Sequence, residues 1–155
     1  MKIKTIALSL FASLCLGLTS MPVSAHGNEK PDTTKSAGPN DGRILKGTDP
    51  RAEFFVTSDR KVQITFFDHH GKVLAPAGHT VVVTAGNRSA PTRLTFSPSG
   101  NVLLSDGPLP AGNRVPTVVQ ITPADAQTVT AKFNVNLAPC PQCKLAEYAC
   151  TCVGH

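Results

Sequence analysis

Apolar and polar residues alternate in short runs along the middle of the chain. In the last run, every second residue is apolar: Val129, Ala131, Phe133, Val135 and Leu137. Polar residues stand between them: Thr128, Thr130, Lys132, Asn134 and Asn136. A period of two with one apolar face predicts a half-buried β-strand. The same period recurs at Val62, Ile64 and Phe66, and again at Leu94 and Phe96.

Clusters of Gly, Pro, Asn and Asp separate these runs, as turns require. The expected strands are RIL, AEFFVTS, KVQITFFD, HTVVVTAG, TRLTFSP, NVLLSD, TVVQITP and TVTAKFNVNL. No window of helical length shows the period of an amphipathic helix. Roughly seven or eight strands, spaced about ten residues apart, predict an all-β fold, an antiparallel β-sandwich of the immunoglobulin-like kind. We place this domain at residues 41–138.

The chain begins with the pattern of a secretory signal peptide. Lys2 and Lys4 form a basic start, TIALSLFASLCLGL is an apolar stretch, and VSA ends at Ala25 with the small residues that a signal peptidase recognises. The apolar stretch is shorter than the roughly 20 residues that span a bilayer. We therefore expect residues 1–25 to be removed, which makes the mature protein periplasmic or secreted and leaves it without a membrane span.

Residues 26–40 follow the predicted cleavage site. This segment, HGNEKPDTTKSAGPN, has almost no apolar side chain to bury, so we expect a flexible lead-in. Cleavage would make His26 the first residue, and two interpretations are open for it. Its α-amine and imidazole can chelate a copper ion together, or it can be a disordered first residue.

Charge and composition narrow the classes of function. Loss of Lys2 and Lys4 with the signal peptide lowers the formal net charge from +5 to +3. The remaining Lys and Arg are scattered, and the chain has one tyrosine and no tryptophan. Nucleic-acid surfaces need a basic stripe, usually with stacking aromatic residues, so no nucleic-acid partner is expected. The sequence contains no G-x-S-x-G, H-E-x-x-H or phosphate-binding glycine loop, so we expect the protein not to be an enzyme.

The last sixteen residues, CPQCKLAEYACTCVGH, concentrate the thiol chemistry of the chain. They hold every cysteine except Cys15, which lies in the predicted signal peptide. Pro139 and Pro141 end the strand pattern, and QCKLAEYA contains good helix formers. Two helical turns over residues 141–149 would place Cys140, Cys143 and Cys150 on one face. With Cys152 and His155 folded back, the tail at residues 139–155 offers four or five ligands.

Two interpretations are open for these cysteines. In the first, the C-x-x-C pair and the C-x-C pair bind one Zn²⁺ or a copper ion, since thiolates suit borderline and soft metals. In the second, the oxidising environment outside the cytoplasm joins each member of CPQC to a member of CTC, because a bridge within CTC would be strained. The first interpretation predicts an exported metal-binding protein, whose partners are a metal ion and another exported protein. The second predicts a structural or interaction module closed by two disulfides.

The internal histidines have another explanation. His69 and His70 follow Asp68 and precede Gly71, in FDHHGK. Although a histidine pair beside a carboxylate can bind metal, the Asp-x-x-Gly spacing is typical of a hairpin turn, in which Asp68 caps the turn and Gly71 has a positive φ. We expect a turn at this position and an exposed side chain at His79.

Two stretches resemble known families. Residues 109–135, LPAGNRVPTVVQITPADAQTVTAKFNV, resemble the last two strands of the periplasmic copper-resistance β-sandwich proteins. That resemblance implies a copper ligand at the amino-terminal histidine, which corresponds to His26. It implies a second in the Asp-containing turn, where this chain has PADAQ and no histidine.

Residues 140–152 resemble the small heavy-metal-binding module of bacterial copper and silver efflux proteins. The matching positions are Cys140, Pro141, Cys143, Tyr148 and Cys150. The order of the two cysteine motifs is reversed in this chain, and the methionine of the module is absent. The resemblance implies that the tail handles a metal ion.

Export predicts a defined mature chain. Cleavage after Ala25 should give a protein whose first residue is His26, because the small-residue site follows the apolar stretch directly. Intact-mass measurement of the protein recovered from the periplasm or the medium checks this. A mature species that still contains Lys2 would contradict the predicted compartment.

Overall fold

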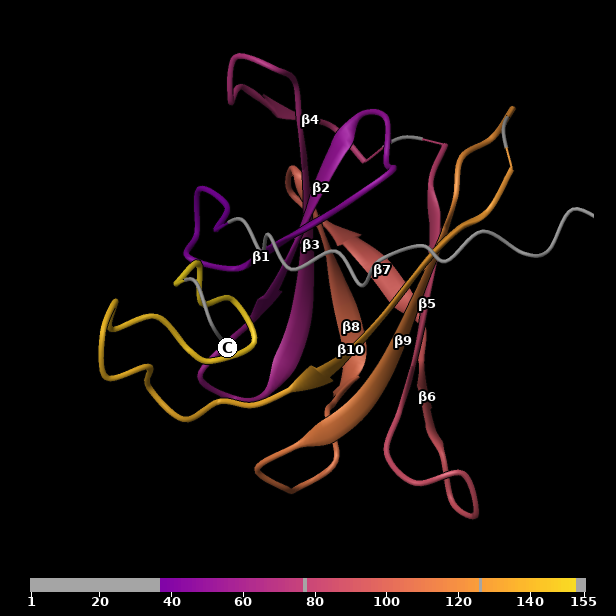
Figure 1. Cartoon of the computed structure of the whole chain (residues 1–155). Helices are drawn as coiled ribbons and strands as arrows, with labels where there is room; N and C mark the ends of the chain where they lie inside the picture. The colour runs from indigo at the N-terminus through magenta and orange to yellow at the C-terminus, as the bar shows by residue number, and fades with distance from the viewer. Residues whose placement is uncertain (1–36, 77, 126, 153–155) are drawn as a thin grey trace, which may run out of the picture. The chain divides into compact units, whose positions relative to one another are not determined.

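The computed structural model describes residues 37–76, 78–125 and 127–152. These residues form an all-β domain (Figure 1). Its strands are β1 (Arg43–Leu45), β2 (Arg51–Val56), β3 (Lys61–Phe67), β4 (Val73–Leu74), β5 (Thr80–Ala85), β6 (Thr92–Leu94), β7 (Phe96–Ser99), β8 (Val102–Pro108), β9 (Val115–Thr122) and β10 (Val129–Val135). Nowhere in the described ranges is there a helix of the length and apolarity that a membrane crossing requires.

The strands form two antiparallel sheets that pack together. The 6-stranded sheet has the order β1-β2-β3-β8-β7, with β4 beside β3, and the 4-stranded sheet has the order β10-β9-β5-β6. Both sheets contribute fully buried apolar side chains to one core: Phe54, Ile64, Phe66, Val83 and Val119. The predicted all-β fold and the β-sandwich are confirmed, whereas the immunoglobulin-like topology stays a prediction.

Each of the eight expected runs contains a strand, with two differences. The two-residue strand β4 was not expected, because Val73 and Leu74 are too short a stretch to show a period. The run TRLTFSP divides at Thr95 into β6 and β7, which belong to different sheets. At Thr95 the chain passes from one sheet to the other. Asp106 fixes this residue, since its carboxylate accepts hydrogen bonds from Thr95 N at 3.1 Å and Thr95 Oγ1 at 2.7 Å.

The histidine pair lies on the turn that the sequence predicts. Gly71 N donates to the carbonyl oxygen of Asp68 at 3.1 Å, and Gly71 has a φ of 82°. Asp68 Oδ1 accepts hydrogen bonds from His70 N at 2.8 Å and Lys72 N at 2.9 Å, so this side chain caps the turn. His79 was expected to be exposed but is half-buried, because its ring lies against Phe66, with 4.2 Å between the ring centroids.

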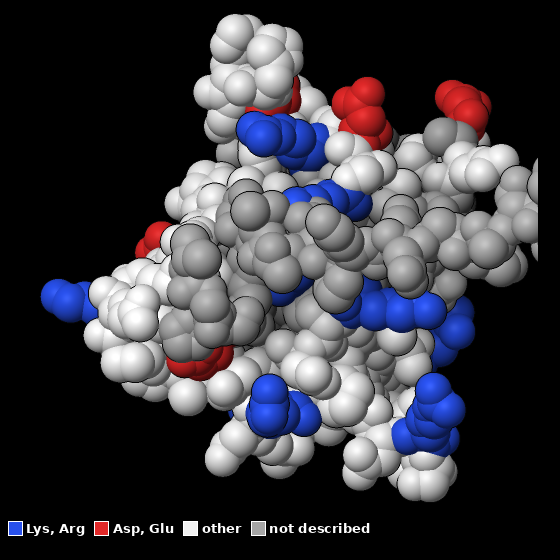
Figure 2. Space-filling view, in the orientation of Figure 1, with Lys and Arg blue, Asp and Glu red and all other residues white. Residues whose placement is uncertain are grey.

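Charged side chains are mostly at the surface. On the face drawn in Figure 2, Lys and Arg stand in several separate groups, and Asp or Glu lie beside some of them. Arg43 is partly buried, and its guanidinium lies 4.7 Å from the ring centroid of Phe133. Burial lowers the pKa of Arg43 from its usual value. This cation therefore contributes to packing between β1 and β10.

Glu53 is completely buried, although it carries a carboxylate. Its side chain points away from the core face of β2, because neighbouring residues of a strand alternate between faces. Backbone and side-chain N–H groups of a turn at residues 38–42 satisfy the carboxylate: Asn40 N at 2.9 Å, Asn40 Nδ2 at 2.7 Å and Gly42 N at 2.8 Å. A Cβ on Gly38 would come within 2.4 Å of the Glu53 side chain, so only glycine fits there.

The turn over Glu53 changes the expected start of the domain. The flexible lead-in was expected at residues 26–40, of which 26–36 lie outside the described residues together with the signal peptide. Residues 37–40 are instead held against β2, and Ala37 forms a β-bridge with Arg43. Sequence polarity did not reveal this contact, because the turn contributes hydrogen bonds and no apolar surface.

Strand β10 alternates as predicted, with Thr130, Lys132 and Asn134 exposed. Its apolar residues at the centre are half-buried, because β10 is an edge strand. The ring of Phe133 meets Phe54 edge-on, with 5.2 Å between the centroids. Phe54, and not Phe133, is therefore the aromatic side chain at the centre of this part of the core.

Truncation of these side chains should follow their burial. Phe54→Ala should lower the free energy of unfolding by about 3–5 kcal/mol, and Phe133→Ala by about 1–3 kcal/mol, because part of the second ring is already exposed. Lys132→Ala, whose side chain points to solvent, should change it by less than about 0.5 kcal/mol. Urea denaturation of the three variants measures these differences. Equal losses at Phe133 and Lys132 would contradict the assigned faces of β10.

Candidate metal centre

The tail is folded by turns, and the two helical turns expected at residues 141–149 are absent. Cys140 N donates to the carbonyl oxygen of Leu145 at 2.7 Å, and Lys144 N donates to that of Cys140 at 3.1 Å. Lys144 adopts a left-handed backbone with a φ of 64°, which reverses the chain. Pro139 and Ala146 then form a β-bridge. The helical expectation failed because the left-handed backbone of Lys144 reverses the chain after a single turn, and the N–H group of Cys140 then bonds across the loop to Leu145.

A second turn returns the chain to the first. Glu147 N donates to the carbonyl oxygen of Ala138 at 2.9 Å, and Ala149 N donates to that of Ala146 at 2.8 Å. Cys150 N closes the same turn through the carbonyl oxygen of Glu147 at 3.3 Å. The two turns lie against each other, so the C-x-x-C pair and the C-x-C pair face one another.

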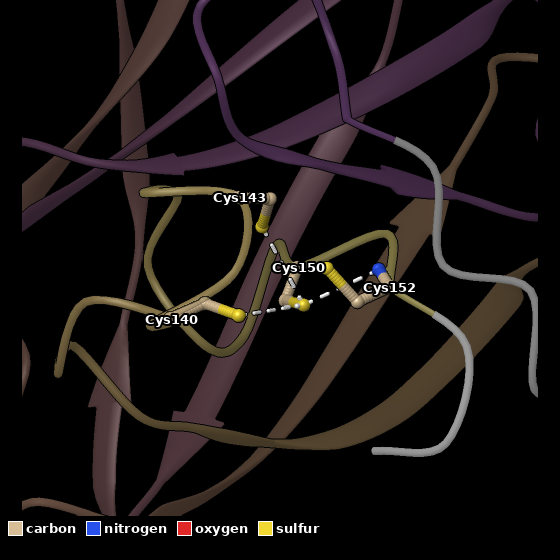
Figure 3. A group of neighbouring side chains, drawn as sticks. All are labelled: Cys140, Cys143, Cys150 and Cys152. Carbon is tan, nitrogen blue, oxygen red and sulfur yellow. Dashed lines mark hydrogen bonds between the residues drawn. The ribbon is translucent and has the colours of Figure 1, made fainter.

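The four cysteines converge on one point, as the sequence predicts (Figure 3). The Sγ atoms of Cys140, Cys143, Cys150 and Cys152 all lie within 4.8 Å of one another. Cys150 is central, with its Sγ 3.3 Å from that of Cys140 and 3.6 Å from that of Cys143. No disulfide joins them. Four sulfurs at about 2.3 Å from a tetrahedral zinc ion lie about 3.8 Å apart, so the spacing of the four thiols fits one such ion.

Burial divides the four thiols into two pairs. Cys140 and Cys150 are buried, with exposed fractions of 1 % and 0 %, whereas Cys143 and Cys152 are partly exposed. Each motif thus supplies one inner and one outer sulfur. The inner pair is shielded from water, and the outer pair, Cys143 and Cys152, is the more accessible to solvent among the described residues.

The thiols differ in their ease of ionisation. Backbone N–H groups of Cys143 and Gln142 point at the sulfur of Cys140 and lower the pKa of its thiol to about 6. Burial raises the pKa of Cys150. Burial and the neighbouring sulfurs raise the pKa of Cys152 to about 12. One thiolate is therefore stabilised by the protein alone, whereas further thiolates in so small a space require a positive charge among them.

Of the candidate ligands that the structure describes, the four cysteines come together and the histidines do not join them. Cys140, Cys143, Cys150 and Cys152 are the one group of metal-ligating side chains that comes together within residues 37–76, 78–125 and 127–152. His69, His70 and His79 belong to the turns around β3 to β5. His155 and His26, the two other predicted ligands, lie outside the described residues.

The tail also contributes to the hydrophobic core, which the sequence did not reveal. Tyr148 and Ala149 are 3 % and 0 % exposed and belong to the core cluster. The ring of Tyr148 meets Phe54 edge-on, with 5.9 Å between centroids, and its hydroxyl oxygen accepts a hydrogen bond from Val56 N at 3.0 Å. The one tyrosine of the chain, placed between two cysteine motifs, was the available signal for this contact.

Comparisons with protein-family models, with curated proteins and with solved structures find no match to this chain. They neither support nor contradict the resemblance of residues 109–135 to the copper-resistance proteins and of residues 140–152 to the efflux-protein module. The geometry of the thiol cluster is thus the principal guide to function.

Removal of the tail tests its contribution to the domain. A chain that ends at Ala138 keeps all ten strands but loses Tyr148 and Ala149 from the core. We expect it to unfold cooperatively in urea, as the completeness of the sheets requires, but at a lower midpoint than the full chain, because one edge of Phe54 becomes exposed. A truncated chain that is already unfolded in water would show that the tail is essential to the fold.

Proposed function

We propose that this protein is exported to the periplasm or secreted, and that it binds one Zn²⁺ or Cu⁺ through Cys140, Cys143, Cys150 and Cys152. The observation that carries the proposal is the convergence of four free sulfurs within 4.8 Å of one another. Thiolates are soft ligands and select Cu⁺ or Zn²⁺, whereas Ca²⁺ and Mg²⁺ require oxygen ligands, which this cluster does not supply.

The ligand set favours binding and not catalysis. A catalytic zinc ion keeps one position open for water or substrate, whereas structural and storage sites fill all four positions with protein ligands. Four cysteines fill a tetrahedron, so His155 and His26 are not needed for a complete site. The protein would act as a carrier, scavenger or sensor of the metal, and it would not be an enzyme.

The location of the site at the surface supports an exchange of metal with other molecules. Cys143 and Cys152 are partly exposed, so a thiol or imidazole of a second protein can approach the ion from their side. Stepwise replacement of these two ligands would move the ion without unfolding the tail. We propose that the partner is another exported protein that supplies or receives the metal. The export itself rests on the signal-peptide pattern of residues 1–25.

Metal titration tests the proposal. Reduced full-length protein should take up about one Zn²⁺ or Cu⁺ per chain and release protons, because thiolates and not thiols are the ligands. Replacing any of the four cysteines by serine should weaken binding more than His155→Ala, since the four sulfurs complete the tetrahedron without histidine. Elemental analysis gives the stoichiometry, and competition with a chromophoric chelator gives the affinities.

The competing interpretation predicts a different mass. If protein taken directly from its compartment contains no metal and is lighter than the reduced form by two pairs of hydrogen atoms, its cysteines are two disulfides. The tail would then be a covalent staple, and the proposal of metal binding would be wrong.

A further inference from the structure

Tyr148 is held by three separate parts of the domain. Its hydroxyl oxygen accepts a hydrogen bond from Val56 N of β2 at 3.0 Å. Its backbone N donates to the carbonyl oxygen of Asn136 at 3.1 Å, and its carbonyl oxygen accepts from Arg43 Nη1 of β1 at 3.4 Å. Tyr148 thus attaches the tail to the larger sheet. The tail is the yellow segment beside β1 in Figure 1.

The attachment at Val56 fills a gap in the sheet. The pairing of β1 with β2 ends where Arg43 stands opposite Phe54, so Val56 lies beyond the end of β1. The N–H group of Val56 therefore has no strand partner on that side, and the hydroxyl of Tyr148 replaces one. The hydrogen bond is buried, and a buried backbone N–H group without a partner is costly. Position 148 therefore requires a side chain that brings a hydrogen-bond acceptor to the buried N–H group of Val56.

The attachment reaches the metal ligands through the chain itself. Tyr148, Ala149 and Cys150 are consecutive, and all three are buried. Cys150 supplies the central sulfur of the cluster, closest to Cys140 and Cys143. With the Tyr148 side chain locked under Val56 and Ala149 enclosed in the core, the backbone of Cys150 has little freedom to move away from the other thiols.

We propose that Tyr148, which is not a ligand, is a positioning residue for the metal site, and that binding of the ion and attachment of the tail to β2 stabilise each other. The inference rests on the proposed function, because it concerns the same four thiols. Reciprocity is a thermodynamic necessity: if attachment raises metal affinity, the metal strengthens attachment by the same factor. A metal ion in the thiol cluster would thereby hold the tail more firmly against the end of β2.

Amide hydrogen exchange on the unmodified full-length protein, reduced, with and without one equivalent of Zn²⁺, measures the coupling. The metal should slow exchange of the Val56 amide by about tenfold or more, because that amide opens only when the tail detaches. Val62 is the internal control. Its N–H group also donates to a side-chain hydroxyl, Ser105 Oγ at 2.9 Å, but this bond does not involve the tail. Val62 opens only by global unfolding, so Zn²⁺ should slow its exchange only by the factor by which the ion stabilises the whole domain.

A matched pair of variants tests the same coupling in the other direction. Tyr148→Phe removes only the hydroxyl that accepts from Val56, and should weaken Zn²⁺ binding by about 5- to 150-fold, the usual span of coupling between sites. Ser105→Ala removes the corresponding hydroxyl that accepts from Val62, and should keep the affinity of the unmodified protein. A loss of affinity in both variants would mean that general destabilisation, and not positioning, is responsible.

The outcomes separate this inference from the proposed function. If the protein binds Zn²⁺ stoichiometrically while Val56 exchange does not change, or if Tyr148→Phe binds as tightly as the unmodified protein, Tyr148 has no positioning role although the metal site stands. If no metal binds at all, both the function and the inference are wrong. Slower exchange at Val56, together with weaker binding in Tyr148→Phe but not in Ser105→Ala, supports the inference.

Discussion

The outer edge of β2 must be covered, because β1 is only half as long as β2. The 3 residues of β1 pair with Ala52 to Phe54, whereas the 6 residues of β2 continue to Val56. Buried backbone N–H groups in native proteins are almost always paired, so the part of β2 beyond β1 needs a partner from elsewhere. The C-terminal tail supplies it with the hydroxyl of Tyr148. The unequal length of two strands therefore decides where the cysteines of the tail come to lie.

The same requirement applies on the face of β2 that points away from the core, but here a side chain needs partners and a turn supplies them. The side chain of Glu53 is the group that needs partners, and the turn at residues 38–42 supplies them through backbone N–H groups and through Asn40 Nδ2. Both ends of the described chain thus close over one strand. Within the described ranges, no buried side-chain nitrogen or oxygen lacks a hydrogen bond. Strand β2 can therefore be buried at low cost, because its carboxylate at Glu53 and its amide at Val56 both have hydrogen-bond partners.

Local patterns predicted the strands well, and contacts between distant segments poorly. The alternation at Val62, Ile64 and Phe66 is a property of neighbouring residues, so it could be recognised directly. The division of TRLTFSP at Thr95 depends on Asp106, and the burial of Tyr148 depends on Val56, which is 92 residues earlier. Such pairings leave no periodic trace in a single sequence.

The candidate site shows the same limit. The spacing of the cysteines predicted the cluster, but a helix was expected to assemble it, whereas two turns do so. Pro139, Pro141 and the left-handed Lys144 decide in favour of turns. Helix propensity in so short a segment is too weak to resist backbone hydrogen bonds that close a loop. The identities of the four sulfur ligands were therefore accessible from the sequence, and the path of the backbone between them was not.

The single tyrosine has an optical consequence. The chain contains no tryptophan, so tyrosine absorption and emission arise entirely from Tyr148. This chromophore is enclosed beside Phe54 and two positions before the central cysteine of the cluster. The protein consequently carries its own spectroscopic probe at a point where the tail meets the sheet, and no label has to be introduced to observe that junction in solution.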